Sequence, residues 1–152
     1  MDPLHLFNLE SHGPDTFVGE GPRYPWGGLF GGQIVAQAFN AATRTVDPDK
    51  AVHSLRAYFI RRGDHTEPIR FEVDRIRNGR SFATRRVVAR QAVGAILNLE
   101  ASFQQFEQTA DLQVAELDRT LPLPDALGDD SWTPLFERRN VAVSYTHLTL
   151  PT

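Results

Sequence analysis

The sequence contains no cysteine. This absence excludes disulfide bonds, thiolate catalysis and cysteine-based metal sites. A histidine metal site is not indicated either, because the histidines are scattered without the spacing that metal ligands share. The five are His5, His12, His53, His65 and His147. The sequence therefore predicts no metal site.

Long apolar runs are also absent from these 152 residues. No stretch is long enough to cross a bilayer, and the N-terminus lacks the basic start and apolar core of a secretory signal. We expect one ordinary soluble domain followed by a tail, located in the cytoplasm and without a membrane span.

Positive charge is concentrated in one region. The net charge is −3, yet the segment from Ala51 to Arg90 holds ten arginines and four acidic residues, a local net charge of +6. Such a region suits a phosphorylated small molecule, whereas a nucleic-acid partner would usually require a basic chain and a reading motif that is missing here. Alternatively, the arginines only solvate the outer faces of strands.

The stretch from Trp26 to Val46 is the element around which we expect the chain to fold. Apolar residues recur there at helical spacing, which predicts a mostly buried helix. A thin polar line runs along it at steps of four, three and four residues. Its members are Gln33, Gln37, Asn40 and Arg44.

Two glycines, Gly31 and Gly32, open this helix. Without Cβ atoms they would let a ligand approach the unpaired first amides of the helix, where an anion or a developing oxyanion is stabilised. The other interpretation is that they only let the chain turn tightly into the helix.

The flanking segments have the alternating pattern of strands. A short strand is expected over Asp15 to Gly19, and four longer ones follow the helix. The first of these carries apolar residues on both faces, which predicts a position inside the sheet. Asn78-Gly79 is a strong hairpin signal because both residues tolerate positive φ. The four longer strands, expected as a meander, are Ala51 to Ile60, Pro68 to Arg77, Ser81 to Gln91 and Ala95 to Phe106.

These elements predict an α+β fold in which a curved antiparallel sheet of about five strands wraps one long apolar helix. The pattern supports an N-terminal domain over residues 1–108. Residues 109–152 contain a proline-rich stretch and an acidic stretch, and we expect them to be a poorly ordered linker and tail.

Several motifs resemble the N-terminal half of the acyl-CoA thioesterase II family, whose members are double hotdog proteins. They lie in order within residues 20–106 and read FGGQIVAQA (30–38), HSLRAYF (53–59), GD (63–64), DR (74–75), NGRSFATRRV (78–87) and ASFQ (101–104). One departure is visible, because the family usually has proline where this chain has Arg62. That difference affects a turn.

The resemblance implies hydrolysis of a fatty acyl-CoA thioester to free acid and CoA without a cofactor. It also implies that the groups credited with activating water, an aspartate with a threonine or serine and a glutamine, lie in a second hotdog half. Residues 143–152 do not continue the family pattern and resemble a translated adaptor tail. We therefore expect a fragment that is authentic to about Arg139 and foreign beyond it.

The two halves of such proteins resemble each other, so positions matching the catalytic ones can be named. His53 could orient or deprotonate a water, Gln33 and Gln104 could position it, and Ser54 could donate a hydrogen bond. The alternatives are a strand histidine satisfied by a neighbour and glutamines that close a half-buried gap.

Contacts with CoA are expected at a second group of residues. Gly79, Arg80 and Ser81 would bracket the CoA arm, and Arg85 or Arg86 would meet its phosphates. A simple hairpin turn and solvated arginines are the other interpretation.

Two functions remain open. The chain is either part of a thioesterase completed by a second half or another subunit, or a non-catalytic hotdog module that gives acyl-CoA-binding or packing surface to a partner. Gln33, Gln37 and Asn40 stand where a general base is wanted, and none can take a proton, which favours the second function for the isolated chain. An exposed sheet edge would promote association with a second half or a second copy. A hotdog dehydratase is a weaker option, since no paired histidine and carboxylate is evident.

Overall fold

The computed structural model describes residues 7–110, 112–114, 120–131 and 133–141. The chain divides into two units, Met1–Gln108 and Thr109–Thr152, which are described separately.

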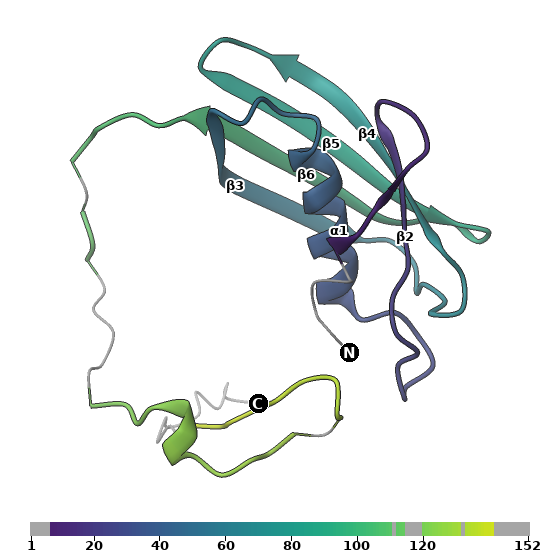
Figure 1. The fold of residues 1–152 in the computed structure, drawn as a ribbon, viewed down its shortest axis with the longest axis vertical. Helices are drawn as coiled ribbons and strands as arrows, with labels where there is room; N and C mark the ends of the chain where they lie inside the picture. The colour runs from purple at the N-terminus through teal and green to yellow at the C-terminus, as the bar shows by residue number, and fades with distance from the viewer. Residues whose placement is uncertain (1–6, 111, 115–119, 132, 142–152) are drawn as a thin grey trace, which may run out of the picture. The chain divides into compact units, whose positions relative to one another are not determined.

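The first unit consists of one helix and one sheet. Helix α1 (Gly31–Thr43) follows strands β1 (Glu10–Ser11) and β2 (Thr16–Gly19) and precedes β3 (Lys50–Phe59), β4 (Ile69–Asn78), β5 (Phe82–Gln91) and β6 (Gly94–Gln105). The described strands form a six-stranded antiparallel sheet in the order β1-β2-β4-β5-β6-β3. Figure 1 shows α1 lying against one face of this sheet, which confirms the expected α+β arrangement.

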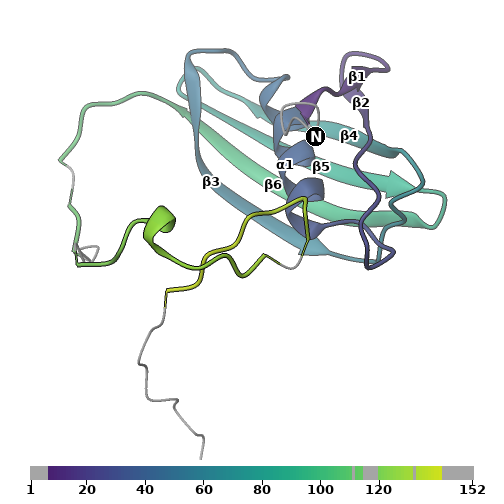
Figure 2. The same ribbon diagram turned by 60° about the horizontal axis from the view of Figure 1, so that its bottom comes forward.

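Strand β3 lies at an edge of the sheet, so the prediction of an internal position was wrong. Among the described residues β3 has one ladder, to β6, and the chain crosses from this edge to β4 on the other side of the β5–β6 pair. Only β4, β5 and β6 form the expected meander. Figure 2 shows β3 at the margin of the sheet. The apolar residues on both of its faces therefore reflect exposure at an edge rather than enclosure within the sheet.

The hairpin signal at Asn78-Gly79 is confirmed in position, since β4 ends at Asn78 and pairs with β5. The expected reason was wrong, because neither Asn78 nor Gly79 has a positive φ in the described chain. The Gly79 N–H instead donates to the carbonyl of Phe82 at 2.8 Å. A Cβ at position 79 would lie 2.9 Å from that same oxygen, so close packing explains the glycine.

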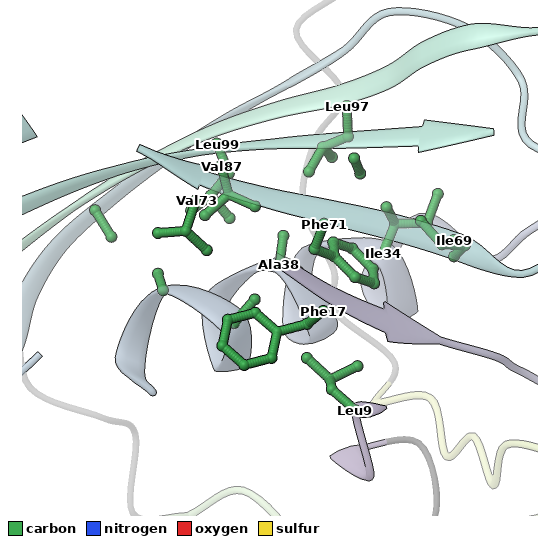
Figure 3. Close-up of a cluster of buried hydrophobic side chains, with 14 of the residues drawn as sticks. Leu9, Phe17, Ile34, Ala38, Ile69, Phe71, Val73, Val87, Leu97 and Leu99 are labelled. Atoms are coloured by element: carbon green, nitrogen blue, oxygen red, sulfur yellow. The ribbon is translucent and has the colours of Figure 1, made fainter. Parts of the chain in front are cut away.

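The core lies between α1 and the sheet. Small residues on the helix, among them Ala38, Ala41 and Ala42, are fully buried and let the helix lie close to the strands. Facing them are buried side chains that alternate along β4, β5 and β6. Figure 3 shows the central members of this cluster, including Ile34, Phe71, Val87, Leu97 and Leu99. The other face of the same strands is mostly polar, although Phe82 and Val88 of β5 lie on it.

The second unit contains a short 3-10 helix, η2 (Pro124–Ala126), and one isolated bridge between Thr133 and Phe136. The segment expected to be foreign falls mostly in residues 142–152, outside the described residues, and its origin stays a prediction. No helix in the described part of the chain is long and apolar enough to cross a membrane.

Candidate functional site

A pocket of about 310 Å³ opens at the start of α1, where β3 ends. Its walls include Leu29, Ile34 and Phe59, with Arg61 and Arg62 beside them. The loop before α1 contacts the end of β3 closely. The Leu29 N–H donates to the Gly63 carbonyl at 3.1 Å, and a Cβ at Gly63 would lie only 2.5 Å from the Leu29 side chain. Gly63 therefore allows the loop before the helix to close against the end of β3.

The glycines at the helix start lie beneath aromatic rings. A Cβ at Gly31 would be 3.0 Å from the Phe59 ring, and a Cβ at Gly32 would be 2.5 Å from the Phe30 ring. Neither glycine has a positive φ. Close ring packing is thus a third reason for these glycines, beside the two that the sequence suggested. Their role in substrate binding stays a prediction.

The polar line of α1 fastens the N-terminal segment to the helix. The Tyr24 hydroxyl donates to Gln33 Oε1 at 2.5 Å, the Gln33 amide donates to Gln37 Oε1 at 3.2 Å, and the Gln37 amide donates to the Glu20 carbonyl at 2.8 Å. Burial raises the pKa of Tyr24, so its hydroxyl remains a donor. Further along, Asn40 donates to the Phe7 carbonyl and Arg44 to the Leu9 carbonyl. Both the oxygen and the nitrogen of the Gln33 side-chain amide are therefore used in hydrogen bonds inside the protein.

His53 lies on the opposite face of the sheet. It stands at an irregularity in the β3–β6 ladder, between Val52 and Ser54, and its Nε2 is 2.8 Å from Ser102 Oγ. The ring of Phe82 meets the imidazole edge-on at 6.1 Å. Ser54 is paired with Ser102, and both line a pocket of about 270 Å³ on this outer face.

Gln104 lies on the same outer face as Ser102 by strand alternation, and its amide donates to Glu107 at 3.2 Å. Three of the four predicted catalytic residues, His53, Ser54 and Gln104, are thus brought to one face, while Gln33 lies on the helix side. Sequence reasoning missed Ser102. The signal available for Ser102 was its place in the ASFQ motif (101–104), where polar residues alternate along the strand.

The predicted CoA contacts differ in their surroundings. Arg80 is exposed and Gly79 and Ser81 are half-buried in the β4–β5 turn, while Arg86 pairs with Asp74 at 2.8 Å. Arg85 is 2% exposed, and its guanidinium donates to Thr45, Asn78 and the Arg77 and Thr84 carbonyls. Burial lowers its pKa. The donors of Arg85 are used inside the protein, so its surroundings give no support to the predicted phosphate contact.

Comparison with known proteins places this geometry in a family. Residues 21–104 match the family described as the acyl-CoA thioesterase N-terminal domain. A human relative named acyl-coenzyme A thioesterase 8 is 43% identical over 124 residues, covering 82% of this chain and 39% of the relative. The acyl-CoA thioesterase 2 of Haemophilus influenzae is 35% identical over 148 residues, covering 97% of this chain and 48% of the relative.

A solved structure shows the same fold. The acyl-CoA thioesterase II TesB2 from Mycobacterium marinum superposes with a TM-score of 0.72 at 39% identity, covering 82% of this chain and 46% of that one. The α+β arrangement is therefore a hotdog-like fold. The chain spans less than half the length of these curated relatives.

Proposed function

Because this chain belongs to the acyl-CoA thioesterase family and matches its N-terminal domain, we propose that it acts as one hotdog half of an enzyme that hydrolyses fatty acyl-CoA. Water adds to the thioester carbonyl, and free fatty acid and CoA are released. This half supplies binding and packing surface, and the groups that activate water come from a partner half. The cytoplasmic location, the absence of a cofactor and the tail over residues 109–152 belong to the same proposal.

The observation that carries the proposal is the open edge at β3. This ten-residue strand has no partner on its outer side within the described sheet. Leu55 is 43% exposed and Phe59 is 62% exposed, although both are large and apolar. An edge of this length and hydrophobicity is a template for pairing with another chain or domain. A second hotdog half, from the same enzyme or from a second copy, would cover it.

The side chains of α1 support the proposal that the general base comes from a partner half. A general base must accept a proton, and neither Gln33 nor Gln37 can do so near neutral pH. Both are also held in the buried hydrogen-bond chain to Tyr24 and Glu20. The pocket at the start of α1 therefore has apolar walls and cationic side chains, but no base among the described residues that line it.

A second candidate is favoured by the contact between His53 and Ser102. An imidazole within hydrogen-bond reach of a hydroxyl can act as a base toward it or toward a bound water. On this view the half would carry its own chemistry on the outer face of the sheet.

Release of CoA from decanoyl-CoA by the full chain distinguishes the two candidates. We expect binding of decanoyl-CoA without CoA release above the uncatalysed rate, and the same result for His53→Ala. Turnover by the wild-type chain that His53→Ala abolishes would overturn the proposal in favour of the second candidate. Far-UV circular dichroism of both proteins establishes that they are folded.

A further inference from the structure

The ten arginines between Ala51 and Arg90 fall into distinct environments. Four pair with carboxylates, namely Arg70 and Arg90 with Glu72, Arg75 with Asp15 and Arg86 with Asp74. Arg85 is buried. Arg56 stands opposite Glu100, Arg77 lies over the Phe82 ring, and Arg80 is exposed in the β4–β5 turn. Most of these arginines thus pair with a carboxylate, lie buried or lie against a neighbouring side chain.

Arg61 and Arg62 differ because they are adjacent and line the same pocket at the start of α1. Neither lies within ion-pair distance of a carboxylate among the residues that the structure describes. The neighbouring Asp64 directs its carboxylate to the Thr66 N–H and hydroxyl, both at 2.7 Å, and these hydrogen bonds lower the pKa of Asp64. The two arginines are therefore cations without a counter-ion in this part of the chain.

Each of these arginines is anchored by a single backbone contact. Arg61 Nη1 donates to the Ala95 carbonyl at 2.9 Å, and Arg62 Nη2 donates to the Trp26 carbonyl at 2.8 Å. A guanidinium has five N–H donors, so most of them remain available to a ligand. Gly28 makes room for Arg62, since a Cβ there would lie 2.7 Å from Arg62 Nε. These contacts leave most donors of both guanidinium groups available to an anion.

The rest of the pocket is apolar. Leu29, Ile34, Phe59 and Ile60 line it together with two glycines. Its volume of about 310 Å³ is at the lower end of the range for small-molecule sites. An apolar wall beside two uncompensated cations suits a molecule with an alkyl portion and an anionic group.

We infer that this pocket binds an anionic amphiphile whose alkyl portion lies against Leu29, Ile34 and Phe59 and whose phosphate or carboxylate is held by Arg61 and Arg62. The inference rests on the proposed function, because acyl-CoA carries phosphates and the product fatty acid carries a carboxylate. It assigns the anion to two residues that sequence reasoning did not select.

The test is calorimetric titration of the full chain with four probes: decyl-CoA, a thioether that cannot be hydrolysed, together with CoA, decanoate and the neutral decanol. We expect the double variant Arg61→Gln, Arg62→Gln to bind decyl-CoA at least tenfold more weakly than the wild type, because charge-assisted hydrogen bonds are lost. Decanol binding should change less than twofold. Arg62→Pro should lose part of the same affinity.

The matched control is Arg90→Gln, which removes one exposed charge paired with Glu72 on the outer face. It should bind every probe within twofold of the wild type. Loss of CoA affinity without loss of decanoate affinity would identify the phosphate as the source of the anion, and the reverse would identify the carboxylate. Unchanged binding of both anions by the double variant, or an equal loss for decanol, would overturn the inference. A wild-type chain could bind decanoate through both arginines and yet not bind decyl-CoA. That result would retain the subsite and reject the thioesterase proposal.

Discussion

Arg85 lies buried in β5, and the described residues place no carboxylate within ion-pair distance of its guanidinium. Its charge is balanced by neutral acceptors: Thr45 Oγ1, Asn78 Oδ1 and the carbonyls of Thr45, Arg77 and Thr84. Thr45 follows the C-terminus of α1, where the helix dipole favours a positive charge. A single side chain therefore ties the end of the helix to the β4–β5 hairpin.

Replacing this residue tests that role. Arg85→Met should lower the free energy of unfolding by about 3 kcal/mol, because several buried acceptors lose their donor. Urea unfolding followed by circular dichroism measures the change. The control Arg86→Met removes an exposed ion pair with Asp74 and should cost about 0.5 kcal/mol or less. Equal effects of the two substitutions would contradict the role given to Arg85.

At the scale of elements, α1 packs with one face on the sheet and holds the N-terminal segment with its polar line. Gln33 and Gln37 are as buried as the apolar residues beside them. Gly21 makes this contact possible, because a Cβ there would overlap the side-chain amide of Gln33. Gln33 and Gln37 in the polar line thus make internal contacts, whereas Arg44 at its end is exposed.

A methyl group at Gly21 should therefore disturb the contact between helix α1 and the N-terminal segment. Gly21→Ala should lower the free energy of unfolding by about 2 kcal/mol through overpacking against Gln33. Thermal unfolding provides the measurement. Gly128→Ala is the matched control, because a Cβ there meets nothing within 4 Å, and it should leave the melting temperature unchanged. A Gly21→Ala protein as stable as the wild type would show that Gln33 can move aside freely.

At the scale of the whole first unit, the dominant feature is the uncovered edge at β3. Residues on its helix-side face, Val52 and Leu55, are 40% and 43% exposed. Helix α1 packs mainly over β4, β5 and β6, so it does not cover them. The unit therefore presents apolar surface beside backbone groups of β3 that pair with no other described strand.

We expect the full chain to self-associate through this edge in a concentration-dependent way. The double variant Val52→Lys, Leu55→Lys should shift the chain toward monomer, because a buried lysine opposes pairing at an edge strand. Sedimentation velocity across a range of concentrations measures the shift. Ile76→Lys, at an exposed residue near the β4–β5 turn, should leave association unchanged. A wild-type chain that stays monomeric throughout would contradict the open-edge interpretation.

Local pattern was enough to predict the helix, the long strands, the hairpin at Asn78-Gly79 and the family. Periodicity reports which residues share a face, and turn chemistry reports where the chain reverses, so both can be determined from neighbouring residues. The motifs between residues 20 and 106 fell within or beside the segment that the family comparison matched. His53, Ser54 and Gln104 were named together with Gln33 from the family resemblance, and their catalytic role stays a prediction.

Only the tertiary structure decided the position of β3, the burial of Arg85 and the separation of Gln33 from His53. Each depends on contacts between residues far apart in the chain. A strand with apolar groups on both faces has the same pattern whether it lies inside a sheet or at an edge awaiting a partner. An arginine in an alternating strand is ordinarily expected on the solvent face, whereas Arg85 lies on the buried face together with Ala83 and Val87. Burial and pairing order are long-range quantities, and for these residues the sequence pattern was compatible with more than one arrangement.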